Sequence, residues 1–251
     1  LIETDAEHRA WGNHTIDFST TKGDNLLVEG ITITDPIRSS IVSYSPTTIR
    51  NVKMMSWNHR NDGITAGKGS LIEGNFIKVK DDNIKLYYSD QVVRNNVIWQ
   101  LTGGGVFKFA WNLPGNVSNI RVSDIDVIHS DVFFDYSRTE PDRPDLSGTS
   151  AIVTSNGYRA DASSSDIIFD DIRIDEQYLL RLMSLRMVTQ HKYPDSMGGK
   201  ITYWGDPDPN ASKIINDITF KNVKLVSAPY IPSTVYGNNG GVIGNLKFKN
   251  L

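Results

Sequence analysis

The sequence has no cysteine, little glutamate, no long apolar run and no cluster of basic residues. Without cysteine, the chain can form neither disulfides nor thiolate metal sites. No window approaches 18 uninterrupted apolar residues, so we expect no transmembrane helix and no membrane partner. The 26 Lys and Arg residues are dispersed and the net charge is −3, so we expect no nucleic-acid partner either.

The acidic residues are unevenly divided, because 23 are Asp and only 6 are Glu. Asn and Gly are also frequent, at 20 residues each. Asp, Asn and Gly serve tight turns, whereas Glu favours helices. Together with a hydrophobic fraction of 39%, this composition predicts a globular protein made of strands and turns.

A short pattern recurs along the chain: an apolar residue, any residue, then Asn, Gly or Asp, then another apolar residue, with one extra residue in some copies. Its eight central residues, which we call the anchors, are Gly30, Asn51, Gly74, Asn95, Asp124, Asp171, Asn222 and Asn250. The first five are 21, 23, 21 and 29 residues apart, a period that suits a solenoid with one coil per repeat.

Runs that alternate apolar and polar residues flank the anchors, as at residues 31–34. A leucine-rich repeat would need a Leu-rich consensus, which is missing. We therefore predict an all-β fold, a right-handed parallel β-helix that forms one domain over residues 1–251. The chain starts at Leu1 and stops within an alternating run, so we expect a truncated piece of a longer protein. One stretch, residues 176–190, could instead be a helix.

Three carboxylates hold similar offsets from their anchors. Asp62 precedes Gly74 by 12 residues, and Asp81 and Asp82 precede Asn95 by 14 and 13. Residues one period apart lie on the same face of a solenoid, so these acids should converge from neighbouring coils. Paired carboxylates can protonate a glycosidic oxygen and activate water. The alternative is a calcium site, because clustered carboxylates also suit Ca²⁺.

Other side chains extend this face. Trp111 and Arg38 each lie 13 residues before an anchor, and a Trp ring can pack against the apolar face of a sugar. For Arg38 we favour an ordinary surface charge. Lys85 and Tyr87 share the alternating face of Asp81, so with Trp111 they are the predicted substrate-binding residues.

Residues 57–63 and 80–89 resemble the glycoside hydrolases of family 49, which are dextranases with isopullulanase and isomaltotriose-releasing dextranase as relatives. The likeness consists of an Asp-Gly followed, 19 and 20 residues later, by an Asp-Asp pair and an Ile-Lys-x-Tyr run. It implies a right-handed parallel β-helix behind an N-terminal β-sandwich, and we expect this chain to hold the β-helix without the sandwich. Three catalytic aspartates of the family fall on Asp62, Asp81 and Asp82, and a Trp at its substrate cleft falls on Trp111.

The resemblance implies a secreted, extracellular glycosidase that cleaves α-1,6 bonds of dextran with inversion. We expect a monomer that needs no metal or other cofactor and has the polysaccharide as its only partner. Asp81 would be the general acid, and Asp62 or Asp82 would activate water.

Other functions remain open. They are isopullulanase-type cleavage of α-1,4 bonds in pullulan, a polygalacturonase-like hydrolase, a pectate-lyase-like enzyme with Ca²⁺, and a noncatalytic carbohydrate-binding solenoid. A polygalacturonase would need cations for the carboxylate of each sugar, and its Arg-Ile-Lys clamp is not found. The sequence therefore favours a neutral glucan.

Overall fold

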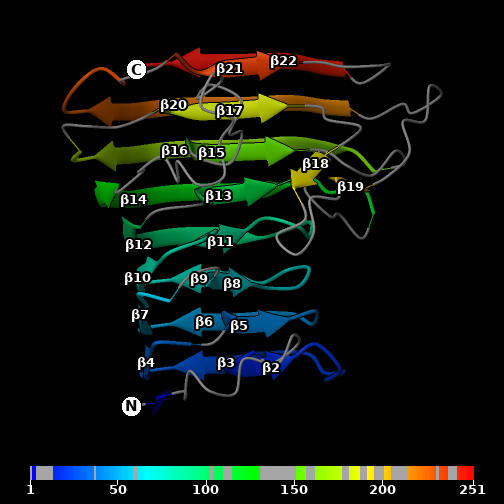
Figure 1. Ribbon diagram of the computed structural model, residues 1–251, viewed down its shortest axis with the longest axis vertical. Helices are drawn as coiled ribbons and strands as arrows, with labels where there is room; N and C mark the ends of the chain where they lie inside the picture. The colour runs from blue at the N-terminus through cyan, green and yellow to red at the C-terminus, as the bar shows by residue number, and fades with distance from the viewer. Residues whose placement is uncertain are drawn as a thin grey trace.

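The computed structural model describes residues 2–3, 14–36, 38–58, 61–101, 104–109, 115–130, 151–156, 162–176, 181–186, 191–194, 201–204, 214–229, 232–236 and 242–251. Within these ranges the regular elements are all strands, and no helix occurs. Successive strands stack in parallel from the N-terminus to the C-terminus as coils of one solenoid (Figure 1). The predicted right-handed parallel β-helix is confirmed.

The larger sheet has 12 strands. They are β1 (Ile2–Glu3), β3 (Leu26–Glu29), β4 (Thr32–Thr34), β6 (Thr47–Arg50), β7 (Lys53–Met55), β9 (Leu71–Glu73), β10 (Phe76–Val79), β12 (Val92–Gln100), β14 (Ile120–Ser130), β16 (Ser164–Ile174), β20 (Ile214–Leu225) and β22 (Val242–Lys249). Most coils contribute either two short strands on either side of an anchor, as β3 and β4 do, or one long strand that contains the anchor, as β14 does; β22 ends one residue before its anchor, Asn250.

The second sheet has eight strands, each paired in parallel with its equivalent on the next coil. They are β2 (Ile16–Phe18), β5 (Ser39–Ser43), β8 (Asp62–Thr65), β11 (Ile84–Lys85), β13 (Gly105–Phe109), β15 (Ala151–Asn156), β17 (Met183–Arg186) and β21 (Thr234–Tyr236). An antiparallel pair, β18 (His191–Pro194) and β19 (Ile201–Trp204), stands at the side of the stack (Figure 1).

All eight anchors adopt a left-handed backbone conformation, with φ between 51° and 69°. Gly, Asn and Asp are the residues that tolerate this region best, which explains why only they fill the position. The ladder between β12 and β14 pairs Arg94 with Ser123 and Asn96 with Ile125, so the two anchors between them stack at a bend. The tight bend predicted at each anchor is confirmed.

The core consists of apolar side chains that stack from coil to coil. One column in the larger sheet runs through Ile33, Met54, Ile77, Ile98, Val127 and Ile174. Each of these six is at most 2% exposed. Full burial of such a side chain stabilises the fold by about 1.5–3 kcal/mol. The column also fixes the register, and thereby decides which residues of neighbouring coils face each other.

The helix considered for residues 176–190 is wrong where the structure describes that stretch. Met183–Arg186 form β17, which pairs in parallel with β15. Leu185 is fully buried between the coils, and this burial overrides the helical preference of Leu, Met and Arg. Residues 177–180 and 187–190 lie outside the described ranges. Among the described segments, none forms a helix that is long and apolar enough to cross a membrane.

Candidate active site

The three predicted acids lie where two neighbouring strands of the second sheet begin, after the chain arrives from the larger sheet. Asp62 is the first residue of β8, and Asp81 and Asp82 lie in the turn between β10 and β11. The register pairs Ile84 with Ile64, so Asp82 stands opposite Asp62 on the next coil. Backbone hydrogen bonds continue the ladder through the turn, from the Asp81 amide to Asn61 O at 2.9 Å.

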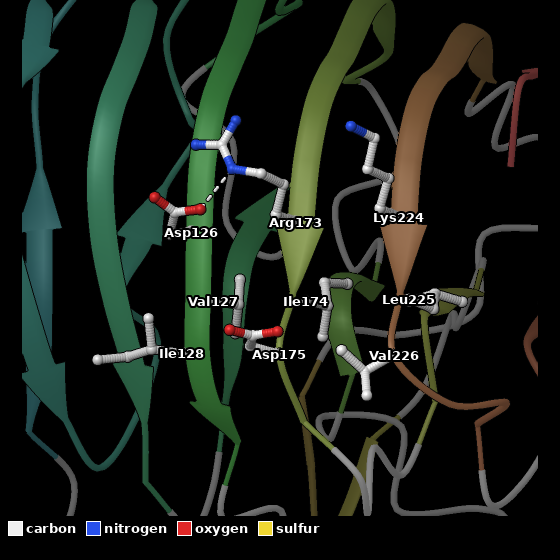
Figure 2. A pocket seen from close by; sticks show the side chains of 9 residues that line it. All are labelled: Asp126, Val127, Ile128, Arg173, Ile174, Asp175, Lys224, Leu225 and Val226. Atoms are coloured by element: carbon white, nitrogen blue, oxygen red, sulfur yellow. Dashed lines mark hydrogen bonds and ion pairs between the residues drawn. The ribbon is translucent and has the colours of Figure 1, made fainter.

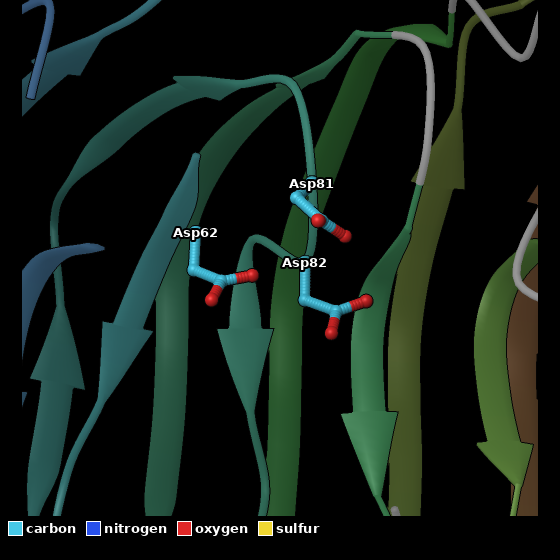
Figure 3. A group of neighbouring side chains, drawn as sticks. All are labelled: Asp62, Asp81 and Asp82. Atoms are coloured by element: carbon cyan, nitrogen blue, oxygen red, sulfur yellow. The ribbon is translucent and has the colours of Figure 1, made fainter. Parts of the chain in front are cut away.

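The side chains of these acids converge. One carboxylate oxygen from each of Asp62, Asp81 and Asp82 lies within 4.8 Å of the others. Figure 3 shows Asp62 on its strand and the other two on the adjacent turn, with their carboxylates gathered on one side. The predicted convergence from neighbouring coils is confirmed, whereas the catalytic roles of these residues stay a prediction.

Glycines allow the coils to approach closely around the acids. A Cβ at Gly63 would stand 2.2 Å from Asn83 O, and one at Gly104 would stand 2.5 Å from Asp82 N and 2.7 Å from Asp81 Oδ1. Gly104 also has a φ of 61°, which favours glycine. The amide of Gly105 donates a hydrogen bond to Asp82 Oδ1 at 3.1 Å. Backbone of the third coil therefore packs directly against the acid pair.

A buried amide pair holds the turn that carries Asp81 and Asp82. Asn83 Nδ2 donates to Gln100 Oε1, and Gln100 Nε2 donates to Asp81 O at 3.2 Å. Neither side chain is more than 1% exposed. Buried amides that find partners fix local geometry, because leaving them unpaired would be costly.

Two lysines accompany the three acids. Lys85 Nζ lies 2.5 Å from Asp62 Oδ2, and the hydroxyl of Ser39 is 3.5 Å from the same oxygen. Lys108 stands beside Lys85 in the register of β11 and β13 and is fully buried. Burial lowers the pKa of Lys108, and the nearby charges of Asp82 and Asp81 oppose this shift. Cations therefore partly offset the charge of the cluster.

The surroundings of the acids shift their protonation. Burial raises the pKa of Asp81 to about 8, and repulsion from the carboxylates of Asp62 and Asp82 adds to the effect. Burial also raises the pKa of Asp62, while the ammonium of Lys85 opposes that rise. Asp81 can thus hold a proton at neutral pH, as a general acid must.

The same three carboxylates are the group that could hold a metal ion among the described residues. Their spacing is compatible with Ca²⁺, whose oxygen ligands lie about 2.3–2.6 Å from the ion. However, the ammonium of Lys85 already occupies Asp62 Oδ2. We therefore interpret the cluster as an acid–base site and do not assign it a metal.

The remaining predicted residues have different outcomes. Lys85 joins the acids through its ion pair with Asp62. Tyr87 is half-buried and packs against the hydrophobic core, and its substrate-binding role stays a prediction. Arg38 adjoins the site through its carbonyl, which accepts a hydrogen bond from the Asp62 amide at 2.7 Å. Trp111 lies outside the described residues.

A separate hollow of about 500 Å³ lies on the larger sheet, across β14, β16 and β20 (Figure 2). Arg173 lines it and contacts Asp126 at 2.5 Å, Asp124 at 2.7 Å and Asp171 at 2.9 Å. Two of these acids belong to the bends at the anchors, so the ion pairs tie neighbouring coils together. We interpret this network as structural.

Sequence reasoning missed Lys108, Gly104 and Gly105. These residues stand outside the recurring pattern that marks the anchors, so the pattern did not point to them. A usable signal existed, because Lys108 follows Lys85 by 23 residues, close to the period of the repeat.

Comparison with known proteins supplies a family context. A dextranase of Arthrobacter sp. (strain CB-8) is 31% identical over 126 residues, which are 47% of this chain and 20% of that protein. A dextranase of Arthrobacter globiformis is 29% identical over 126 residues with the same coverage. An isopullulanase of Aspergillus niger is 34% identical over 70 residues, 28% of this chain and 12% of that protein.

No protein family model matches the chain. The chain spans at most a fifth of the length of the three relatives. The resemblance to family 49 glycoside hydrolases that the sequence predicts is nevertheless confirmed by these matches.

Proposed function

We propose that this chain carries the acid–base centre of a glycoside hydrolase that cleaves a neutral α-glucan, with dextran as the first candidate. The observation that carries the proposal is the convergence of the carboxylates of Asp62, Asp81 and Asp82 within 4.8 Å. Two carboxylates that flank one bond are what glycoside hydrolysis requires. The names of the three relatives, two dextranases and one isopullulanase, support the same reaction class.

Asp81 is the general acid in this proposal. Its raised pKa, about 8, keeps it protonated at neutral pH. It donates its proton to the glycosidic oxygen as the bond to the sugar breaks. The leaving chain then departs as a neutral alcohol.

Asp62 or Asp82 is the base that takes a proton from the attacking water. Asp62 is held by Lys85, and Asp82 is held by the amide of Gly105. Both arrangements hold the carboxylate in a fixed position, and the ammonium of Lys85 also favours the ionised form of Asp62. The ion pair with Lys85 makes Asp62 the first choice to test.

We also propose that the reaction inverts the configuration at the anomeric carbon, and this part of the proposal rests on the family resemblance. An inverting pair leaves about 6.5–9.5 Å between its carboxyl groups, whereas a retaining pair leaves about 5–5.5 Å. The nearest oxygens of this cluster lie within 4.8 Å, so its geometry does not itself argue for inversion. Proton NMR of the first product formed, before it mutarotates, identifies the anomer and decides between the two courses.

Product analysis on dextran and on pullulan tests the substrate. We expect oligosaccharides with α-1,6 linkages from dextran and little cleavage of pullulan. Cleavage of pullulan at α-1,4 bonds would instead favour the isopullulanase alternative. Binding of either glucan without any product would favour a noncatalytic carbohydrate-binding solenoid and overturn the proposal. The secreted location and the monomeric state are part of the same proposal; fractionation of a culture and the mass in solution test them.

A further inference from the structure

A row of side chains crosses the outer face of the larger sheet close to the acids. The register aligns Met55 of β7, Lys78 of β10, Trp99 of β12 and His129 of β14. The residues before and after Lys78 point into the core and are fully buried, so Lys78 and its row face outward. Trp57 follows β7 by two residues and leans over the same row.

Direct contacts hold this row together. The ammonium of Lys78 lies 4.0 Å from the ring centroid of Trp99 and 4.8 Å from that of Trp57. The Trp99 ring meets the imidazole of His129 edge-on, with 5.0 Å between centroids. Cation–π contacts of this kind contribute about 0.5–1 kcal/mol at exposed sites. The two indoles are therefore positioned before any ligand arrives.

Trp57 is open to solvent although its backbone is fixed. Its side chain is 56% exposed, while its amide donates to Asp35 Oδ1 at 3.1 Å. An exposed Trp with a fixed backbone offers a large, flat apolar surface to a ligand, and such rings are enriched where proteins bind partners. Because the ring is already ordered, little conformational entropy would be lost when it binds a ligand.

The row is connected to the acid site through the chain itself. Lys78 precedes Asp81 by three residues, which can span at most about 10 Å. Trp99 directly precedes Gln100, whose side chain donates to Asp81 O at 3.2 Å. A polymer held by its reacting bond at the acids would therefore have its next units within reach of Trp57.

We propose that Trp57, supported by Lys78 and Trp99, is an outer binding platform for a sugar ring of the same glucan chain. The apolar C–H face of a pyranose packs against the open indole face, and this contact requires no charge on the sugar. Lys78 also offers N–H donors for a sugar hydroxyl at the edge of the platform. The identity of the ligand rests on the proposed function.

The test separates a long ligand from a short one. Isothermal calorimetry would measure binding of isomaltose and of an isomalto-oligosaccharide of about eight units, in an Asp81→Asn background that prevents cleavage. Trp57→Ala should weaken binding of the long ligand about tenfold and leave isomaltose unchanged. Trp57→Phe keeps a ring and should recover part of the loss. In the active protein, Trp57→Ala should raise KM for the long substrate with little change in kcat.

Leu27→Ala is the matched control, because Leu27 is 54% exposed on β3 and lies outside this row. It should change neither binding nor KM. If the protein cleaves dextran but Trp57→Ala binds the long ligand as tightly as before, the platform proposal is wrong and the proposed function stands. An equal loss of affinity for both ligands would mean that Trp57 either binds the sugars next to the cleaved bond or is needed for folding. Either result would also overturn the platform proposal. If no α-glucan binds or is cleaved, the proposed function fails and the platform fails with it.

Discussion

The ammonium of Lys85 on β11 lies 2.5 Å from Asp62 Oδ2 on β8, so an ion pair joins neighbouring coils at the centre of the candidate site. Both side chains are largely shielded, at 18% and 14% exposed. A shielded cation favours the ionised form of its partner carboxylate. Lys85 therefore acts electrostatically on Asp62, while its contact with substrate stays a prediction.

Replacing Lys85 tests whether Asp62 is the base. In Lys85→Met, the pKa of Asp62 should rise further, because the cation that opposes its rise is gone. The acidic limb of the kcat/KM profile should then move upward by about one pH unit or more. Lys85→Arg keeps the charge, so its acidic limb should lie close to that of the unmodified protein.

A surface pair provides the control. Lys68 lies 3.4 Å from Asp90 but is 73% exposed, so Lys68→Met should leave the pH profile unchanged. An unmoved acidic limb in Lys85→Met would assign the base to Asp82.

The basic limb of the same profile reports on Asp81. Because burial and neighbouring carboxylates raise its pKa from 3.8 to about 8, Asp81 is protonated below that pH and ionised above it. A general acid works only when it is protonated, so kcat/KM for dextran should fall above about pH 8. A profile that already falls from about pH 5 would show that Asp81 is ionised in the free protein and is not the acid.

We expect that no other residue can replace Gly104, because a side chain at this position would point directly at Asp81 and Asp82. In Gly104→Ala, the new Cβ would stand 2.5 Å from the backbone of Asp81 and Asp82, in a left-handed conformation. We expect a loss of about 3 kcal/mol or more in the free energy of unfolding, and a larger loss in activity. Urea denaturation and kcat measure the two effects.

Gly69 separates the steric clash from backbone strain. Its φ is 74°, yet nothing lies within 4 Å of a Cβ added there. Gly69→Ala should cost only about 1–2 kcal/mol and leave activity intact. Similar losses in both variants would mean that the contact with the acids is unimportant.

Metal removal should have no effect on hydrolysis. Acid–base cleavage by carboxylates needs no cation, and the ammonium of Lys85 occupies Asp62 Oδ2. Dialysis against EDTA should therefore leave kcat on dextran unchanged. Activity that disappears on chelation and returns with Ca²⁺ would favour the lyase alternative.

The repeat made the fold and the acids readable from the sequence. Each coil has a left-handed bend, and only a few residue types are tolerated there. Gly, Asn or Asp therefore recurs once per coil, and the spacing of these residues reveals the period of the repeat. Counting from Gly74 and Asn95 was enough to bring Asp62 and Asp82 onto adjacent coils. The register in fact places these two acids opposite each other, although their offsets differ by one residue.

Contacts between coils were harder to predict. Lys108 and Gly104 matter because of what the register brings beside them, and neither belongs to the recurring pattern. A second column of left-handed residues was also overlooked; its members include Asn119, Asp166, Asp217 and Asn245. Asn119, Asp217 and Asn245 stand in the same pattern as the anchors, between an apolar residue two places before and one directly after, so the sequence did carry a signal for this second bend.

The last prediction compares two Asp-Asp pairs that the chain uses differently. Asp81→Asn keeps the size of the side chain but cannot deliver a proton, so kcat on dextran should fall by roughly 10²–10⁴-fold. Binding of the glucan by calorimetry should remain nearly intact. An activated aryl glucoside, if the site accepts one, needs little help in leaving and should lose much less. Asp171→Asn alters an anchor with a φ of 51°, which Asn also adopts readily.

The cost at Asp171 should be structural and small. Asn loses the charge that contacts Arg173 at 2.9 Å, and a half-exposed ion pair of this kind contributes about 0–1 kcal/mol. Its kcat should equal that of the unmodified protein, because Asp171 lies in the bend of the larger sheet, whereas Asp81 lies with the other two carboxylates where strands of the second sheet begin. Equal and small losses of kcat at the two positions would refute Asp81 as the acid and favour a solenoid that binds carbohydrate without cleaving it.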